Sequence, residues 1–542
     1  MASVTIAGMA SSVVPHPAVI ERLDRLAPDQ RAAATAPAGP VLCVAPAGSG
    51  KTTTLVARAC WLIGGGLEPA GITAVTFNKR AADELGERLA SALEPLGAGS
   101  PRVRTFHALG REILVDAGVP VDNLADRAVV LRSLRRGRLA AAELRRLDDG
   151  FSRIKLDLGL DATAVARFAR SAKSPIEPDI AGAFVAYERW LAANQALDFD
   201  DLVRRALALL RSDVDLLRSW QARCATLLVD EVQDVDRSQL ELAVLLAGER
   251  RNVFLVGDDD QTIYAWRLAD VRRVLDLAAS LPGLRRVDLV TNYRCPRPVV
   301  ERAVRLIERN GERFAKTIRA GPGAAGSLLL LPDSGDELAR ARRLLAEWYG
   351  RQEGGYAVLA RTNAELAPYA AVALEAGIQY RAADDGLLLD HSRLDELLVA
   401  LPDNRLPALE LAGSRASALQ RALLGWSLAY PTADALRAAI DDARRRRAEL
   451  RRDDARLVLA TAHGTKGLEF DHVAVIGMDD GVFPSRRTIE EHDSPARALE
   501  EERRLAYVAW TRARRSLTLV YDPAAPSVFI TDAFSAAELA AS

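Results

Sequence analysis

The first residues whose types and spacing suggest chemistry form a short glycine-rich segment. It follows the apolar run Val41–Val44, precedes a predicted helix, and reads Ala45-Pro46-Ala47-Gly48-Ser49-Gly50-Lys51-Thr52. Glycines let backbone N–H groups converge on phosphate oxygens, and a helix N-terminus adds partial positive charge. We expect Lys51 to reach the β- and γ-phosphates of ATP and the Thr52 hydroxyl to hold Mg²⁺. The strict pattern begins with Gly where this chain has Ala45. The alternative, a chance Gly/Ser loop before a helix, accounts less well for Gly-Lys-Thr in this context.

Two adjacent carboxylates end a second apolar run. Thr226–Val229 is followed by Asp230 and Glu231, and then by Gln233 and Asp234. In nucleotide hydrolysis one carboxylate supports Mg²⁺ and a second orients or deprotonates water. We therefore predict that Asp230 binds the metal and that Glu231 is the general base. The alternative for such a pair is a helix N-cap.

Buried strands must position these residues. Short apolar runs rich in β-branched residues alternate with longer helical stretches, which is typical of parallel sheets covered on both faces. The runs are Val41–Ala45, Ile72–Phe77, Leu227–Val229, Val253–Gly257, Tyr356–Ala360 and His472–Gly477. They form two α/β blocks, from about Ala27 to Val290 and from about Thr291 to Tyr521. Each block is interrupted by a helical stretch, the first over Leu109–Leu210 and the second over Asp395–Asp454. The tail after Ala524 is expected to be frayed.

Composition limits the classes of function. The chain has 542 residues and a formal net charge of −1, so any nucleic acid must meet a local groove. The four cysteines form no C-x-x-C pair, Met1–Pro15 has no basic start, and no apolar run approaches the ~20 residues that span a bilayer. We therefore expect a cytoplasmic protein with no membrane association. Lysine occurs six times; three lie in motifs, whereas Lys155, Lys173 and Lys316 are expected on the surface.

Further motifs follow in a fixed order along the chain. They are Gln30; Thr76-Phe77-Asn78-Lys79; Thr105-Phe106-His107; Asp230–Asp234; Gly257–Arg267; Asn292-Tyr293-Arg294; Thr461–Asp471; and Glu501–Ala513. In this order the sequence resembles the UvrD/Rep-type superfamily 1 DNA helicases, over about Leu26 to Tyr521. Any one motif could arise by accident, but the ordered set is specific.

The resemblance implies an α/β fold of two RecA-like P-loop NTPase lobes with parallel sheets, each carrying a mainly helical insertion. The implied boundaries are 1–108 and 205–290 for lobe 1A, 109–204 for insertion 1B, 291–394 and 455–525 for lobe 2A, 395–454 for a reduced insertion 2B, and 526–542 for a C-terminal tail.

The resemblance also implies roles at the nucleotide. Gln30 would bond the adenine edge and Tyr293 would stack on its face, while Glu469 would contact the ribose. The remaining ATP contacts would come from Ala45, Pro46, Ala47, Gly48, Ser49, Gly50, Lys51, Thr52 and Thr53, although many members have Arg in place of Thr53. Gln261 would sense the γ-phosphate. Arg294 and Arg512 would be arginine fingers, because a planar guanidinium suits phosphoryl charge better than an ammonium does.

Single-stranded DNA is the implied partner, together with single-strand/duplex junctions. Aromatic rings stack on bases of any sequence, which suits a stepping motor. Phe77, Tyr264 and Trp266 are expected to stack, whereas Phe106 is expected in the core. Candidate backbone contacts are Thr76, Asn78, Thr105, His107, Arg361, Thr461 and His463. His107 and His463 have an interior position as an alternative, and Lys79 and Lys466 either contact DNA or are structural.

Together these residues predict an ATP- and Mg²⁺-dependent DNA helicase or translocase that is monomeric in isolation. The resemblance to the family implies 3′–5′ movement and a role in DNA repair or replication. Two departures from the family are Leu268, where Gly is usual, and the short second insertion. The second departure motivates an alternative, a translocase or protein-displacing subunit with little unwinding alone. An ATP-gated DNA clamp and a phosphate-loop kinase for a small molecule remain further alternatives; Glu231, Gln261, Arg294 and Arg512 argue against the clamp, and the later motifs argue against the kinase.

Overall fold

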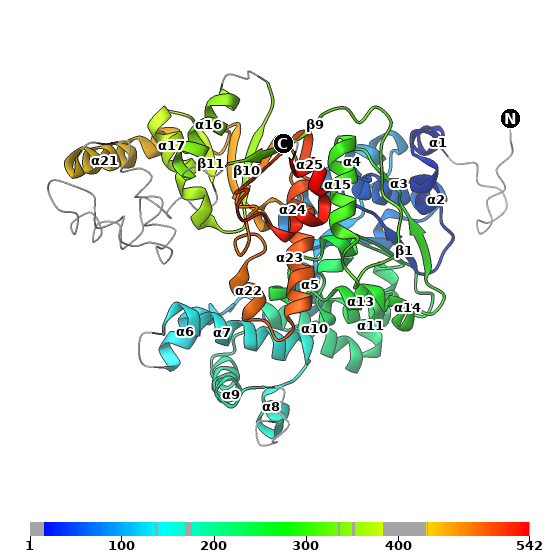
Figure 1. Cartoon of the computed structure of the whole chain (residues 1–542). Helices are drawn as coiled ribbons and strands as arrows, with labels where there is room; N and C mark the ends of the chain where they lie inside the picture. The colour runs from blue at the N-terminus through cyan, green and yellow to red at the C-terminus, as the bar shows by residue number, and fades with distance from the viewer. Residues whose placement is uncertain are drawn as a thin grey trace. The chain divides into compact units, whose positions relative to one another are not determined.

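The computed structural model describes residues 16–135, 139–168, 176–333, 337–349, 353–382, 430 and 432–540 (Figure 1). The chain divides into two compact units. Unit 1 holds the described residues up to Val290 together with Arg313–Lys316, and unit 2 holds Thr291–Glu312 and the described residues from Thr317 onward. Within the described residues, no helix combines the length and apolar character needed to cross a bilayer.

Unit 1 is built on a six-stranded sheet in which every neighbouring pair is parallel, in the order β3-β2-β4-β5-β1-β6. The strands are β1 (Val41–Val44), β2 (Ile72–Thr76), β3 (Arg102–Thr105), β4 (Thr226–Val229), β5 (Val253–Gly257) and β6 (Arg285–Asp288). Because β1 and β4 both pair in parallel with β5, which lies between them, the carboxyl ends of β1 and β4 lie at the same edge of the sheet. The predicted strands of the first block are therefore confirmed, and the loop after Val44 comes close to the carboxylates after Val229.

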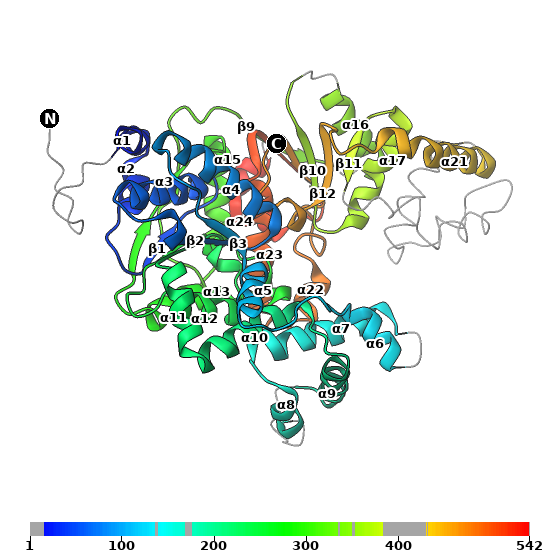
Figure 2. The ribbon, with the colours of Figure 1, turned by 180° about the vertical axis from the view of Figure 1, so that it is seen from behind.

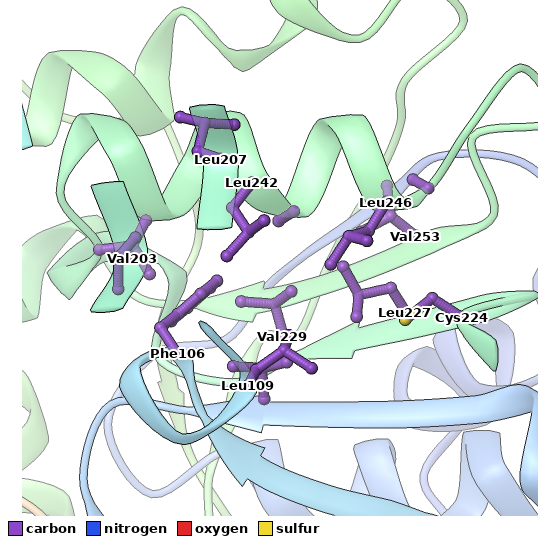
Figure 3. Close-up of a cluster of buried hydrophobic side chains, with 14 of the residues drawn as sticks. Phe106, Leu109, Val203, Leu207, Cys224, Leu227, Val229, Leu242, Leu246 and Val253 are labelled. Atoms are coloured by element: carbon purple, nitrogen blue, oxygen red, sulfur yellow. The ribbon is translucent and has the colours of Figure 1, made fainter. Parts of the chain in front are cut away.

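Helices cover both faces of this sheet. They are α1 (Pro17–Asp24), α2 (Pro28–Ala34), α3 (Lys51–Gly64), α4 (Lys79–Leu93), α5 (Phe106–Asp116), α10 (Phe199–Ser212), α11 (Val214–Arg223), α12 (Arg237–Leu246), α13 (Val271–Leu275) and α14 (Leu277–Ser280). Successive strand residues serve opposite faces: Val41 and Cys43 pack with α3 and α4, whereas Leu42 and Val44 pack with α5, α10 and α12. Figure 2 shows α3 and α4 on one side and α11 and α12 on the other. Figure 3 shows the apolar cluster between the sheet and α5, α10 and α12, in which Phe106 packs as predicted.

A group of helices inside unit 1 has a core of its own. It comprises α6 (Arg127–Leu134), α7 (Ala141–Ser152), α8 (Ala162–Phe168) and α9 (Pro178–Ala193), with a π-helical turn over Arg153–Asp157. In both views these helices lie together, away from β1 (Figures 1 and 2). Phe151, Phe184 and Tyr187 are fully buried among them. The part of the predicted helical stretch Leu109–Leu210 that lies between α5 and α10 therefore folds around its own apolar cluster, whereas α5 and α10 pack on the sheet.

Unit 2 has a second six-stranded sheet of parallel pairs, in the order β11-β12-β10-β13-β14-β9. Its strands are β9 (Ser327–Pro332), β10 (Tyr356–Ala360), β11 (Tyr380–Ala382), β12 (Leu457–Thr461), β13 (Phe470–Val475) and β14 (Ala513–Tyr521). Its helices are α15 (Arg297–Ile307), α16 (Glu337–Tyr349), α17 (Ala367–Ala376), α21 (Ala433–Leu450), α22 (Arg486–Glu490), α23 (Pro495–Trp510), α24 (Val528–Ala533) and α25 (Ala536–Ala540). A separate parallel pair joins β7 (Thr291–Asn292) to β8 (Arg319–Ala320). The predicted α/β class with parallel sheets is confirmed.

Two predictions for unit 2 concern the second helical insertion and the C-terminal tail. Of the predicted second insertion, residues 395–429 and 431 lie outside the described residues, and α21 carries the charge run of Asp441–Arg447. The prediction of a frayed tail after Ala524 is wrong for most of that segment. Phe529 and Ile530 of α24 are fully buried, and α24 packs against α15. The apolar pair was too short to stand out in an Ala- and Ser-rich sequence.

Candidate nucleotide site and nucleic-acid interface

The glycine-rich loop has the shape that phosphate binding requires. It leaves β1, ends at Gly50 in a left-handed conformation (φ 84°), and leads directly into α3 at Lys51. The Lys51 ammonium donates to the carbonyl of Ala45 at 3.0 Å, at the opposite end of the loop. The Ser49 hydroxyl is buried and has no hydrogen-bond partner among the residues that the structure describes. These features fit a triphosphate, which would offer acceptor oxygens to the lysine, the hydroxyl and the loop amides.

Gln30 lies against this loop. Its side-chain amide donates to the carbonyl of Ser49 at 2.8 Å and accepts from the amide of Ala27 at 3.1 Å. A Cβ on Gly50 would approach the Gln30 Nε2 atom to 2.6 Å, so the glycine also makes room for this contact. The predicted adenine contact and the predicted phosphate loop are thus brought together, with the exposed Thr53 nearby on α3.

The two carboxylates after β4 have distinct surroundings. Asp230 is buried, and its Oδ1 atom accepts from the amide of Glu231 at 3.0 Å. Glu231 is half-buried and has a positive φ of 52°, a conformation that costs a non-glycine residue of the order of 1 kcal/mol. Strain of this kind clusters at functional sites, where surrounding contacts hold it in place. Carboxylate and hydroxyl oxygens suit Mg²⁺, so Asp230 and Thr52 fit a metal that ATP would bring.

A hydrogen-bond chain joins Glu231 to the segment after β5. The Gln233 amide donates to Glu231 Oε2 at 2.5 Å, and its oxygen accepts from the backbone N–H of Asp258 at 3.0 Å. Asp258 Oδ2 in turn accepts from the Gln261 side chain at 2.6 Å. Asp258 and Gln261 are buried in and beside the 3₁₀ turn Asp259–Gln261. The candidate base and the candidate γ-phosphate sensor therefore belong to one rigid network.

The charges around Asp258 keep it ionised. Although burial raises its pKa, the ammonium groups of Lys316 and Lys51 lower it, and the net direction is downward. The contribution of Lys51 means that the phosphate loop lies within electrostatic reach of this network. Lys51, Glu231 and Gln261 thus share one edge of the unit 1 sheet.

Unit 2 brings together four of its predicted nucleotide residues. The Arg294 guanidinium pairs with Glu469 Oε2 at 2.8 Å and donates to the carbonyl of Thr511 at 3.2 Å. The Arg512 side chain is buried and donates to the carbonyls of Val508 at 2.9 Å and Leu468 at 3.1 Å. Tyr293, beside Arg294, is 51% exposed. Two guanidinium groups, a carboxylate and a ring therefore gather where β7, the segment before β13 and the end of α23 meet.

An aromatic group in unit 1 provides a stacking surface. The rings of Phe77 and Tyr264 are stacked with centroids 5.1 Å apart, and Trp266 meets Tyr264 edge-on at 6.1 Å. Trp266 is 58% exposed, and the Arg267 guanidinium lies over its ring at 4.7 Å. Such an exposed indole beside a cation is suited to an unpaired base and its phosphate.

Four predicted backbone contacts in unit 1 lie at or just before helix starts. Asn78 caps α4 by accepting from the amide of Ala81, and Thr105 caps α5 by accepting from that of Ala108. Thr76 is buried, with its hydroxyl donating to the carbonyl of Asn78 at 3.1 Å. Burial lowers the pKa of His107 to about 4, so this imidazole is neutral at pH 7. In the predicted DNA contact it would therefore supply a hydrogen bond but no charge.

The three predicted contacts in unit 2 also lie close together. Arg361 follows β10 and forms a bidentate pair with the buried carboxylate of Glu502, at 2.7–2.9 Å. Thr461 ends β12, and its hydroxyl accepts from the amide of Gly464 at 3.3 Å. Burial, with the Arg361 charge, lowers the pKa of His463 to about 4. The guanidinium of Arg361 is thus held by Glu502 in this structure.

The sequence did not single out one residue that the structure places beside these sites, and it predicted the wrong environment for two lysines. Phe199 is 59% exposed and stacks on His107 at 3.9 Å; its place at the start of α10, one position after the N-cap Asp198, was the only signal. The prediction of surface positions for Lys155 and Lys316 is wrong, because both ammonium groups are fully buried among carboxylates. Lys173 lies outside the described residues.

Comparison with known proteins agrees with this geometry. The UvrD/REP helicase N-terminal domain matches residues 26–282, and the UvrD-like helicase C-terminal domain matches residues 432–523. ATP-dependent DNA helicase UvrD2 of Mycobacterium tuberculosis (strain H37Rv) is 32% identical over 90% of this chain and 77% of its own length. The chain belongs to the UvrD/Rep helicase family.

Other relatives fit this assignment. DNA helicase II of Escherichia coli (strain K12) is 29% identical over 92% of this chain and 84% of its own length, and ATP-dependent DNA helicase PcrA of Bacillus subtilis (strain 168) is 26% identical over 92% and 82%. The predicted family is confirmed, and with it the two RecA-like lobes and the class of enzyme, an ATP-hydrolysing DNA helicase.

Proposed function

We propose that this helicase is a motor that moves 3′ to 5′ along single-stranded DNA and opens duplex DNA at single-strand/duplex junctions, in DNA repair or replication. The observation that carries the motor activity in this proposal is the hydrogen-bond chain from Glu231 through Gln233 and Asp258 to Gln261, within electrostatic reach of Lys51. It joins a base, a phosphate sensor and a phosphate-binding lysine, which is the equipment for hydrolysis coupled to a change of state. The direction and the pathway rest on the resemblance to the family.

The nucleotide would bind with its phosphates on the loop Ala45–Thr52 and its adenine at Gln30. Mg²⁺, held by Thr52 and Asp230, would neutralise charge on the β- and γ-phosphates. Glu231, whose Oε2 atom accepts a hydrogen bond from the Gln233 side chain, would orient and deprotonate the attacking water. Arg294 and Arg512 would stabilise the charge that develops on the transferred phosphoryl group.

For Arg294 to act in this way, its guanidinium must leave Glu469 and bind the nucleotide phosphate instead. Its present partner Glu469 is 43% exposed in the side chain, and such a pair is weak enough to open when a phosphate competes. Glu469 would then be available to the ribose. Arg512 donates to backbone carbonyls in the described state, so its terminal amino groups would have to reorient toward the nucleotide.

DNA would lie along the aromatic group of unit 1. Trp266 is the most exposed ring of that group, and Phe199 with His107 adds a second stacked pair that could receive a base. Thr76, Asn78 and Thr105 would contact the DNA backbone from unit 1, and Arg361, Thr461 and His463 from unit 2. Because stacking is independent of sequence, the motor would advance on any strand.

Direction is tested by placing a biotin–streptavidin block at either end of an oligonucleotide. A 3′-to-5′ motor displaces streptavidin from the 5′ end much faster than from the 3′ end when ATP and Mg²⁺ are present. Glu231→Gln should remove displacement at both ends while the variant still binds ATP. Faster displacement at the 3′ end by the parent protein would refute the proposed direction.

A second candidate function is translocation with little unwinding by the isolated chain. The comparison that favours it is length: the match with DNA helicase II extends over 622 residues, whereas this chain has 542, so that relative carries segments that this chain lacks. If the reduced 395–454 segment limits strand separation, the protein would translocate yet open a 3′-tailed duplex only with a partner protein. Efficient unwinding of that duplex by the protein alone would exclude this candidate.

A further inference from the structure

A four-residue strap, Arg313–Lys316, belongs to unit 1 although the chain on both sides of it belongs to unit 2. The chain therefore leaves unit 2 after Glu312, contributes four residues to unit 1 and returns to unit 2 at Thr317. The strap is fastened in unit 1 at three points, two by side chains and one by the backbone amide of Phe314, which donates to Asp259 Oδ2 at 2.8 Å.

Both cations of the strap meet the carboxylates of Asp258–Asp260. Lys316 Nζ lies 2.7 Å from Asp258 Oδ1 and 2.9 Å from Asp260 Oδ2, and it also pairs with Asp259 at 2.5 Å. The Arg313 guanidinium forms two bonds to Asp260, at 2.9 and 2.8 Å. The side chains of Lys316 and all three aspartates are fully buried, so these charges depend on one another.

Asp258 connects the strap to the phosphate sensor. One of its carboxylate oxygens binds Lys316, and the other accepts from the side chain of Gln261. If Lys316 withdrew, Asp258 would lose its nearest counter-charge in a buried site and would have to rotate or take up a proton. Either change removes or weakens the acceptor that orients Gln261.

On its other side the strap leads to the arginine finger. Three residues after Lys316 the chain forms β8, whose Arg319 and Ala320 pair with Thr291 and Asn292 of β7. The Asn292 side chain accepts from the amide of Arg294 at 2.9 Å. The amide of Gly321 donates to the carbonyl of Asn292 at 2.8 Å, so the returning chain is held directly beside Tyr293 and Arg294.

We propose that Lys316 and Arg313 are positioning residues that tie the γ-phosphate sensor Gln261 to the arginine finger Arg294. The tie runs from Gln261 through Asp258 to Lys316, and then along the chain to the β7–β8 pair. It rests on the proposed function, because it deepens the coupling between ATP hydrolysis and movement on DNA. The state of the sensor reaches the finger, and the state of the finger reaches the sensor, through a short segment of backbone.

Four variants test this proposal. Arg313→Gln removes one anchor at a partly exposed position. Lys316→Met removes the central anchor and leaves three buried carboxylates with fewer partners. Asp259→Asn/Lys316→Met removes one carboxylate together with the ammonium, which restores charge balance while the tie to Asp258 stays cut. Arg204→Gln is the matched control, because Arg204 pairs with Asp201 and Glu188 in unit 1 far along the chain from the strap.

The measurements are thermal unfolding, steady-state ATP hydrolysis on oligo(dT), and nucleotides travelled per ATP. We expect Arg313→Gln and the double variant to lower the DNA-stimulated kcat at least tenfold and to reduce the distance per ATP, while the KM for ATP changes less than threefold. Arg204→Gln should leave kcat and distance per ATP within twofold of the parent. A purely structural role would instead let the double variant recover activity together with stability.

The outcomes distinguish failure of the proposed function from failure of the proposed tie. If the parent enzyme is not stimulated by single-stranded DNA, the proposed function fails. If the parent is stimulated and the folded Arg313→Gln and double variants keep its kcat and distance per ATP, the tie is refuted and the proposed function stands. If Lys316→Met does not fold, Arg313→Gln and the double variant still test the tie.

Discussion

Substitution of Gly257 by Ala should damage both stability and hydrolysis. Gly257 ends β5, directly before Asp258, and a Cβ there would lie 2.4 Å from Gln233 Oε1 and 2.8 Å from Val232 Cγ1. Neither neighbour is free to retreat, because Gln233 and Val232 are both buried. The oxygen that would collide is the one that accepts from Asp258, so the clash falls on the link between Glu231 and Gln261.

The size of the effect follows from two costs. Overpacking a buried site typically costs about 1–3 kcal/mol. If Gln233 moves away to relieve the clash, the buried N–H of Asp258 loses its acceptor, which costs about 1–3 kcal/mol more. We therefore expect the unfolding free energy to fall by about 2–6 kcal/mol. Glu231 loses its hydrogen bond from Gln233 at the same time. A loss of about 1.4–2.8 kcal/mol of transition-state stabilisation corresponds to a 10- to 100-fold fall in kcat.

The assay compares Gly257→Ala with Gly182→Ala by urea unfolding and by DNA-stimulated ATP hydrolysis. Gly182 lies within α9, where an added Cβ meets nothing within 4 Å. Alanine is the better helix former, so Gly182→Ala should stabilise by about 0.5–1 kcal/mol and leave hydrolysis unchanged. The same chemical change should thus have opposite signs at the two positions. Parent-like stability and kcat in Gly257→Ala would refute the view that this close approach holds the network together.

Three further substitutions have defined outcomes. Burial raises the pKa of Asp236 to about 7, above its unfolded value, so the folded state binds the extra proton and loses stability as pH rises from about 4 to 7. Asp236→Asn keeps an N-cap for α12 and removes the buried charge, so urea unfolding should show a higher unfolding free energy at pH 8 but not at pH 4. Gln195 is exposed with φ 50°, so Gln195→Gly should stabilise by about 0.5–1 kcal/mol, and a lower urea midpoint would contradict this. Trp266→Ala should weaken oligo(dT) binding by about 1–3 kcal/mol, roughly 5- to 150-fold in fluorescence anisotropy, and unchanged affinity would remove Trp266 from the DNA path.

Local sequence was sufficient for the parts of the molecule whose geometry is set locally. The glycine loop between Val44 and Lys51 and the carboxylates after Val229 follow from a strand, a turn and a helix in succession. The strands β1, β2, β4, β5, β10 and β13 were predicted from continuous apolar runs, which are typical of strands covered on both faces. These elements also fix which residues share the edge of the sheet. The strands β3, β6 and β9 are more exposed and were not predicted.

Contacts between distant segments were not readable in the same way. Lys316 looked like a surface lysine because its three carboxylate partners lie more than 50 residues earlier in the chain. Phe199 looked like an ordinary first-turn residue, and only the fold brings it onto His107. The buried apolar side of α24 is set by its packing on α15, which no period within a six-residue helix reveals. Burial of charge therefore has to be read from the three-dimensional structure.

The central claim is that ATP hydrolysis, with Glu231 as the general base, is stimulated by single-stranded DNA and drives movement along it. The most direct measurement is phosphate release by the parent protein and by Glu231→Gln, each with and without oligo(dT) and with Mg²⁺ present. The account predicts strong stimulation of the parent by DNA and loss of that rate in Glu231→Gln, which should retain nucleotide binding. A parent rate that does not respond to DNA, or a Glu231→Gln variant that hydrolyses ATP as the parent does, would contradict it.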